Sequence, residues 1–251
     1  GSSERIESID VIRGIALLGI FIMNTPYFST SMFAGVDGTH LFNATYDRVA
    51  ADARDLLFSG KFNSMFSALF AIGFTIQYSR LQQADPARAT GIYVRRLLVL
   101  LGFGIIHGYF IWIGDILHTY ALLGLVLVLG FNRLKDRWVW VAFALTMIVP
   151  PIINLSRLPL MTPAFMQHQL DVMKAYEAST NQAFGHGSFL QMVRENMRVF
   201  EFGYLDPLAL PSTINSYLMI ASTMLLGLLA GRHRLIQRAS EFQPTLWRLL
   251  W

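Results

Sequence analysis

Long apolar runs separated by shorter polar segments dominate the chain. The runs cover residues 9–28, 62–81, 97–113, 116–131, 138–153 and 214–231. A helix needs about 20 mostly apolar residues to cross roughly 30 Å of hydrocarbon, and these runs approach that length. The pattern therefore predicts an all-α fold, a polytopic transmembrane helix bundle with about six spans.

The overall composition agrees with a lipid environment. Of the 251 residues, 54% are hydrophobic and only 14% are charged, whereas about 25% of the residues in an average soluble domain are charged. We therefore expect residues 1–251 to form a single transmembrane domain. Pro244-Thr245-Leu246-Trp247 is typical of the approach to a further helix, so we expect this chain to be the N-terminal part of a longer protein.

The distribution of Lys and Arg predicts the orientation of the spans, because loops kept in the cytoplasm are enriched in these residues. Thirteen of the 20 basic residues fall in segments 1–13, 80–96, 132–137 and 232–251, and the other seven fall in the much longer loops 25–61 and 154–211. This asymmetry predicts that both termini are cytoplasmic and that the two long loops are external.

Several functional classes are disfavoured. The net charge of +4 reflects basic residues at helix ends rather than a nucleic-acid surface. The chain has no cysteine, which excludes disulfides and thiolate chemistry. Its six histidines lack the close spacing of a zinc site, so no metal is expected. No phosphate-binding glycine motif and no nucleophile elbow is apparent.

The second long loop, residues 154–211, contains a predicted amphipathic helix. The residues that fall on one face of this helix, by their i, i+3, i+4, i+7 spacing, are Phe189, Met192, Val193, Asn196, Met197 and Phe200. Such a helix lies on the membrane surface, covers a cavity, or simply packs on the bundle. Just before this loop, Pro150 and Pro151 predict a break in the fifth span.

Ionisable side chains at the external ends of the third and fourth spans are the first candidate site. Only Gly114 and Asp115 join these spans, which predicts a tight antiparallel hairpin with His107 and His118 at similar depth. A carboxylate beside an imidazole orients the ring and raises its basicity, as a general base requires. We predict catalytic roles for His107, Asp115 and His118; the alternative is that the histidines only bond backbone carbonyls.

A second candidate group lies at the cytoplasmic ends of the spans. Asp10 and Arg13 are one helical turn apart within an apolar segment, so pairing would lower the free-energy penalty of burying them. Arg95 and Arg96 stand at the start of the third span, and their guanidinium groups can hold phosphates. The positive-inside bias alone also accounts for Arg95 and Arg96, as it does for Arg80.

Four blocks of this sequence resemble the YeiB-like bacterial membrane proteins. They are SIDVIRGIALLGI at residues 8–20 followed by Asn24, Lys61-Phe62 leading to Gly73, Arg95-Arg96-Leu97 leading to His107, and Gly114-Asp115-Ile116-Leu117 followed by Tyr120. The family is similar, more distantly, to heparan-α-glucosaminide N-acetyltransferase and to transmembrane acyltransferases, whose first helix carries a similar Asp-x-x-Arg-Gly pattern. The family pattern includes Asp10, Arg13, Asn24, Lys61, His107 and Asp115, whereas His118 is particular to this sequence.

The resemblance implies transfer of an acyl group from a cytoplasmic donor to an acceptor near the external face. Acyl-CoA would be the donor, with no tightly bound cofactor, and Asp10, Arg13, Arg95 and Arg96 would hold it. Asn24, Lys61 and Tyr120 would bind the acceptor, a small molecule or glycan; Lys61 otherwise reaches the membrane interface. The acetyltransferase's external histidine has only His40 as a shifted counterpart here.

Other functions remain open. A transporter or exporter of a small polar or amphiphilic solute would use the same ionisable residues as a proton relay or as ligands. A structural or assembly subunit is a third alternative. We expect a multi-pass protein of the bacterial inner membrane, with the lipid bilayer and further copies of the chain as partners and with no nucleic acid.

Overall fold

The computed structural model describes residues 7–28, 30–35, 44–238 and 241, and among these it is helical without a strand. The helices are α1 (Glu7–Asn24), α2 (Thr45–Phe58), α3 (Lys61–Ala84), α4 (Ala89–Phe110), α5 (Leu117–Val126), α6 (Asp136–Arg157), α7 (Pro163–His186), α8 (Phe189–Leu205) and α9 (Leu210–Arg232). Short 3-10 helices cover Thr25–Phe28 and Leu158–Leu160, and a π-helical turn, Leu127–Phe131, continues α5.

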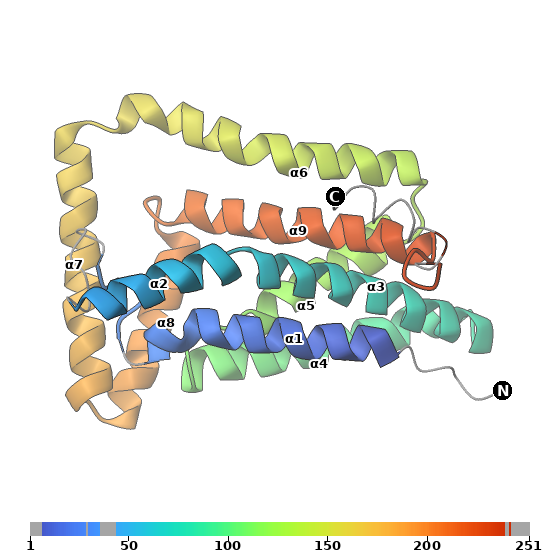
Figure 1. The fold of residues 1–251 in the computed structure, drawn as a ribbon, viewed down its shortest axis with the longest axis horizontal. Coiled ribbons are helices and arrows are strands. Elements are labelled where there is room, and N and C mark those ends of the chain that lie inside the picture. The colour runs from blue at the N-terminus through green and yellow to red at the C-terminus, as the bar shows by residue number, and fades with distance from the viewer. Residues whose placement is uncertain (1–6, 29, 36–43, 239–240, 242–251) are drawn as a thin grey trace.

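The long helices run along a common direction, and α7 stands across one end of them (Figure 1). Helix α3 packs against α1, α4 and α9, while α6 packs on the outer side of α9. At the end covered by α7, helix α8 packs against α4, α7 and α9. The fold is thus a helix bundle with a helical cap at one end.

Five helical segments are long and apolar enough to cross a membrane: Ile9–Phe28, Thr45–Ala84, Ala89–Phe110, Asp136–Leu160 and Leu210–Arg232. Five of the predicted spans fall on them. The remaining predicted span, residues 116–131, is the shorter apolar segment Leu117–Phe131. The six-span count and the cytoplasmic termini stay predictions.

The outward surface of these helices is apolar. Leu98 on α4, Ile148 on α6 and Met219 on α9 are all more than half exposed. Such a surface is unfavourable in water and favourable in hydrocarbon. The helices therefore form a membrane protein, as the composition predicted.

The centre of the bundle is filled mainly by α3, α5 and α9. Phe74, Tyr120, Met224 and Leu228 are almost completely buried and belong to one continuous apolar cluster. Close packing of this kind fixes the relative positions of the helices, because cavities in such a core are unfavourable. The cluster thereby holds α5 in place below the candidate site.

Two local expectations were wrong. Helix α6 continues through Pro150 and Pro151 instead of breaking there, since the bundle supports a helix that lacks these two backbone donors. The hairpin connection is residues 111–116 rather than two residues, because α4 ends at Phe110 and α5 begins at Leu117. The longer connection leaves room for Asp115 to fold back toward α4.

The second long loop holds two helices, α7 and α8, rather than the one predicted. Both begin with side-chain caps: Thr162 Oγ1 accepts a hydrogen bond from the Phe165 backbone, and Ser188 and Gln191 form a capping box. Helix α8 packs on the bundle with Val193, Asn196 and Val199 buried. Phe189 and Met197, two of the residues on the predicted amphipathic face, are exposed.

Candidate functional site

One buried carboxylate lies between the two predicted histidines. Asp115 Oδ1 is 3.0 Å from His107 Nδ1, and Asp115 Oδ2 is 2.8 Å from His118 Nδ1. The Asp115 side chain is 1% exposed, against 34% for His107 and 8% for His118. We call these three residues the histidine cluster.

The start of α5 and a glycine on α4 position this cluster. Asp115 Oδ2 also accepts a hydrogen bond of 3.0 Å from the backbone N–H of His118, so the carboxylate caps the first turn of α5. A Cβ atom at Gly104 would overlap the His118 backbone nitrogen and lie 2.9 Å from Asp115 Oδ2. Gly104 therefore permits the close approach of α4 and α5 that the site requires.

The surroundings keep Asp115 ionised. Burial raises the pKa of a carboxyl group, but here the hydrogen bonds from the His118 ring and backbone outweigh it and hold the pKa of Asp115 below its ordinary value. A negative Asp115 can accept a hydrogen bond at each oxygen and stabilise a protonated imidazole. This is the electrostatic arrangement of a base that must take up a proton.

The contacts of the two histidines with Asp115 are not equivalent. His118 Nδ1 is hydrogen-bonded to Asp115 Oδ2, whereas His107 Nδ1 and Asp115 Oδ1, although 3.0 Å apart, lack hydrogen-bond geometry. A rotation of the His107 ring would align the two atoms. His118 is thus the fixed ring of the cluster and His107 the adjustable one.

Two tyrosines extend the cluster, and the sequence analysis missed both. His118 Nε2 is hydrogen-bonded to the hydroxyl of Tyr204 on α8, which in turn lies 2.9 Å from the hydroxyl of Tyr217 on α9. Burial raises the pKa of Tyr204, so its hydroxyl keeps its proton. With Tyr204 donating to Nε2, the neutral His118 ring donates from Nδ1 to Asp115.

The histidine cluster stands between two cavities. The large cavity, about 850 Å³, is lined by His107 together with Asn24, Trp112 and Asn196. The hydroxyl-lined cavity, about 290 Å³, is lined by Asp115 of the connection before α5, by His118 and Thr119 on α5, by Tyr204 on α8, and by Ser212, Thr213, Ser216 and Tyr217 on α9. The two cavities share Met32, Ile113 and Val199 as walls. The histidine cluster therefore has one histidine in each cavity, with Asp115 between the two rings.

At the other candidate group, Asp10 and Arg13 pair loosely. Arg13 Nη1 is 3.5 Å from Asp10 Oδ1, and Nη2 donates a 3.3 Å hydrogen bond to the Leu69 carbonyl. Both side chains are about a third exposed. We call Asp10 and Arg13 the arginine cluster.

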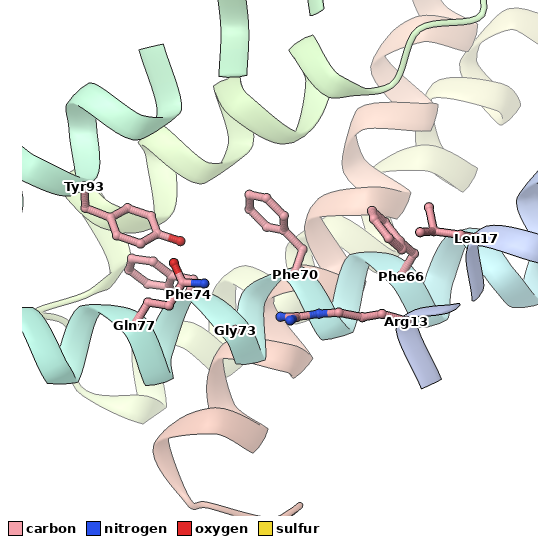
Figure 2. A pocket seen from close by; sticks show the side chains of 8 residues that line it. All are labelled: Arg13, Leu17, Phe66, Phe70, Gly73, Phe74, Gln77 and Tyr93. Atoms are coloured by element: carbon pink, nitrogen blue, oxygen red, sulfur yellow. The ribbon is translucent and has the colours of Figure 1, made fainter. Parts of the chain in front are cut away.

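Arg13 reaches into a cavity of about 340 Å³, the arginine cavity. Figure 2 shows its guanidinium group lying along α3 at Gly73, with the aromatic rings of Phe66, Phe70 and Phe74 on the same helix and Tyr93 facing them from α4. A Cβ atom at residue 73 would overlap Arg13 Nη2. Leu17 lines both the arginine cavity and the large cavity.

The other arginines predicted to hold a donor are separate from Arg13. Arg95 and Arg96 are exposed on α4, and Arg96 Nη1 donates a 3.3 Å hydrogen bond to Gln77 Oε1. Gln77 lines the arginine cavity, so Arg96 is connected to it through one side chain. Arg80 instead lines a small cavity of about 120 Å³ together with Asp10 and Arg13.

The three predicted acceptor-binding residues lie in different surroundings. Asn24 lines the large cavity. Lys61 is exposed and its Nζ donates to the Leu56 carbonyl, at the C-terminal end of α2. Tyr120 is 1% exposed and shares a 2.8 Å hydrogen bond with Ser67, which favours a packing role over contact with an acceptor. His40 lies outside the described residues.

The structure adds Asn196 of α8 to the site. It was already one of the helical positions noted in the sequence, but its partner could not be found by local pattern: its Nδ2 donates a 3.0 Å hydrogen bond to the Tyr109 carbonyl, 87 residues away. Tyr204 follows Asn196 at a spacing of two helical turns, so both face the bundle. Among the described residues, no group of three His, Asp or Glu side chains is arranged to hold a metal ion.

Comparisons with known proteins support a YeiB-like relationship. The chain is 39% identical over 141 residues to the uncharacterized protein YxaH of Bacillus subtilis. The matched region covers 54% of this chain and 35% of YxaH. It is 36% identical over 129 residues to the uncharacterized protein YeiB of Escherichia coli, covering 49% of this chain and 30% of YeiB. The matches thus span about half of this chain and about a third of each relative.

A third relative is an uncharacterized 39.9 kDa protein of Bacillus acidopullulyticus, 35% identical over 53% of this chain and 35% of that protein. No family model matches the chain. No solved structure matches it either. These relatives are uncharacterized, so function has to be argued from the site itself.

Proposed function

We propose that the protein is a membrane-embedded acyltransferase that moves an acyl group from a cytoplasmic donor to an acceptor near the external face. The observation that carries this proposal is the buried Asp115 carboxylate, which lies between His118 and the His107 ring that lines the large cavity. A carboxylate, an imidazole and an adjoining cavity are the elements that a general base needs to act on a bound hydroxyl or amine.

In the proposed reaction, His107 Nε2 takes the proton of the acceptor hydroxyl while Nδ1 interacts with Asp115. The acceptor oxygen attacks the thioester carbonyl of an acyl-CoA, a carbon–oxygen bond forms, and the carbon–sulfur bond breaks. The CoA thiolate leaves and the proton returns to its sulfur. The products are the acylated acceptor and free CoA, and no oxidant or reductant is needed.

The arginine cluster is the proposed donor end. The Arg13 guanidinium can bind a phosphate or the amide carbonyls of the pantetheine arm, and the rings of Phe66, Phe70 and Phe74 offer an apolar wall. Leu17 lines both cavities, and we propose that the long flexible arm of the donor passes this residue on its way from Arg13 toward His107. Arg95 and Arg96 would add positive charge near the entrance, and we propose the bacterial inner membrane as the location.

The test is release of free CoA thiol by the purified protein in liposomes. Because the chain has no cysteine, a thiol reagent reports the product without background from the protein. Acetyl-CoA and longer acyl-CoAs are supplied, with water and octyl glucoside as acceptors. Thiol release that falls at least a hundredfold in His107→Ala supports the proposal; no release by the unaltered protein with any chain length overturns it.

A proton-coupled transporter is the second candidate. It is favoured by the chain of side chains from His107 through Asp115, His118 and Tyr204 to Tyr217, which links two cavities. The continuous course of α6 through its two prolines removes the broken helix expected of a transporter. Proton uptake into liposomes driven by a solute, without thiol release, would favour this candidate.

A further inference from the structure

The large cavity lacks the charged lining of an anion or cation site. The described residues that line it include no Asp, Glu, Lys or Arg, and its polar groups are amides, hydroxyls and His107. A ligand with a full charge would be poorly compensated there, because a charge removed from water needs a partner of opposite sign. The lining therefore favours an uncharged ligand.

Asn196 provides a hydrogen-bond acceptor in this cavity. Its side chain is completely buried, and Nδ2 is engaged by the Tyr109 carbonyl two residues beyond His107. The other end, Oδ1, has no hydrogen-bond partner among the described residues. A buried carbonyl oxygen without a donor is unfavourable, so the site is complete only when a ligand or water supplies an O–H or N–H group.

Another part of the lining is aromatic and apolar. The rings of Phe28 and Trp112 are 5.1 Å apart at 67°, and Phe21 lies 5.7 Å from Phe28. Leu17 and Ile20 continue this wall along α1, and the 54% exposure of Leu17 places it at the outer surface of the bundle. An apolar chain can therefore lie along α1 and pass into lipid, while the polar group stays at Asn196.

We infer that the large cavity binds a neutral, hydroxyl-bearing amphiphile whose apolar chain enters along α1 from the bilayer. Its hydroxyl groups donate to Asn196 Oδ1 and reach His107, and its chain contacts Leu17, Ile20 and Phe21. The description of this ligand as the acyl acceptor rests on the proposed function, but its binding does not. Alkyl glycosides and monoacylglycerols both carry this chemistry.

Photolabelling of the purified protein in phosphatidylcholine nanodiscs tests the inference. The probe is octyl glucoside with a diazirine in its alkyl chain, and labelled residues are mapped by mass spectrometry. We expect saturable labelling of α1 and of the 111–113 segment. Octyl glucoside or monooctanoylglycerol should compete, whichever of the two lipid classes is the natural source, and their relative potency identifies that class. Methyl glucoside, which lacks the chain, and octyl sulfate, which is charged, should compete at least tenfold more weakly.

Asn196→Leu and Asn215→Leu form a matched pair. Both asparagines have a buried Oδ1 without a partner, but Asn215 bonds Asn154 and does not line the large cavity. Asn196→Leu should weaken competition by octyl glucoside about tenfold, and Asn215→Leu should leave it unchanged.

Equal effects of the two substitutions, labelling spread over the whole outer surface, or octyl sulfate competing as well as octyl glucoside would overturn the inference. If Asn196→Leu does not fold, the labelling map and the competition series of the unaltered protein decide it. Saturable binding without thiol release would leave the inference standing and overturn the proposed function alone.

Discussion

The histidine cluster and the arginine cluster are built in opposite ways. Asp115 is nearly inaccessible, lies within 3.0 Å of two histidine rings, and caps α5. Arg13 is a third exposed and its contacts with Asp10 and Leu69 are 3.5 and 3.3 Å long. Asp115 and His118 are held in one geometry by their hydrogen bonds, whereas Arg13 has only long contacts and room to move.

This difference matches two kinds of task. A carboxylate that orients a general base gains from being held in place, since misplacement of the base by about 1 Å lowers the rate strongly. A group that grips a mobile ligand can be loosely held before the ligand arrives, because the ligand supplies the missing partners. Substitutions that disturb one cluster and spare the other test this difference.

The largest effect is expected from Asp115→Asn. The amide has only one accepting oxygen, so it cannot serve His107, His118 and the α5 backbone together. We expect the free energy of unfolding to fall by about 3 kcal/mol, as when one partner of a buried pair is removed. Unfolding in a denaturing detergent measures this change. The control is Asp85→Asn, because the exposed ion pair of Asp85 with Arg88 should contribute less than about 1 kcal/mol.

The pH dependence of that difference has a definite sign. Because the folded-state pKa of Asp115 lies below its ordinary value of 3.8, ionised Asp115 contributes stability above pH 3.8, and the contribution is lost as the pH falls through the folded-state pKa. The stability gap between the unaltered protein and Asp115→Asn should therefore narrow only in that acid range. A gap that closed near pH 6 would contradict the account of Asp115.

The next effect is expected at Gly104. In Gly104→Ala the new methyl group meets the His118 backbone, which cannot move aside as a side-chain end could. We expect a loss of about 1–3 kcal/mol from overpacking and a displaced histidine cluster. Gly102→Ala is the control on the same helix, because a Cβ atom there meets nothing within 4 Å. Equal melting temperatures for the two variants would contradict the close approach of α4 and α5.

Much of the fold could be predicted from the sequence, because apolar runs of this length have few alternatives. The helices of the two long loops, α2 and α7, were missed, since their apolar positions are sparse and the capping residue Thr162 is a weak local signal. The hairpin length was wrong because residues 111–113 are apolar, and hydropathy cannot distinguish an apolar loop from a helix end.

In the candidate site, the grouping of His107, Asp115 and His118 could be predicted because the three residues lie close together in the sequence. Tyr204 and Asn196 did not, because their partners lie 86 and 87 residues away. Only the packing of α8 on α4 and α9 brings them in. The resemblance assigned Tyr120 to acceptor binding. The burial of Tyr120 results from the packing of α3 against α5, which a match of short sequence blocks does not reveal.

A smaller effect is expected from Tyr204→Phe. This change removes the hydroxyl that bonds His118 Nε2 and Tyr217 but keeps the ring, so the free energy of unfolding should fall by about 1 kcal/mol. The rate of thiol release should also fall, and by more than the loss of folded protein explains, because His118 loses the hydrogen-bond partner that fixes its tautomer. The pH profile of thiol release should shift in Tyr204→Phe and stay unchanged in Tyr46→Phe, a substitution at an exposed tyrosine of α2.

The smallest effect on stability is expected from Gly73→Ala. The methyl group meets only the end of the flexible Arg13 side chain, which can swing away, so unfolding should change by less than about 0.5 kcal/mol. Binding of acyl-CoA should weaken nonetheless, because Arg13 is displaced from its cavity. The control is Gly14→Ala, where a Cβ atom meets nothing within 4 Å, and it should leave acyl-CoA binding intact. If both variants bind acyl-CoA equally well, Arg13 does not hold the donor.

The most direct test of this division of roles, donor binding at the arginine cluster and proton transfer at the histidine cluster, is calorimetric titration. Acetyl-CoA and longer acyl-CoAs are titrated into the purified unaltered protein, Arg13→Ala and His107→Ala. The account predicts saturable binding that Arg13→Ala weakens at least tenfold and that His107→Ala retains. Binding lost in His107→Ala but kept in Arg13→Ala, or no binding of any acyl-CoA to the unaltered protein, would contradict it.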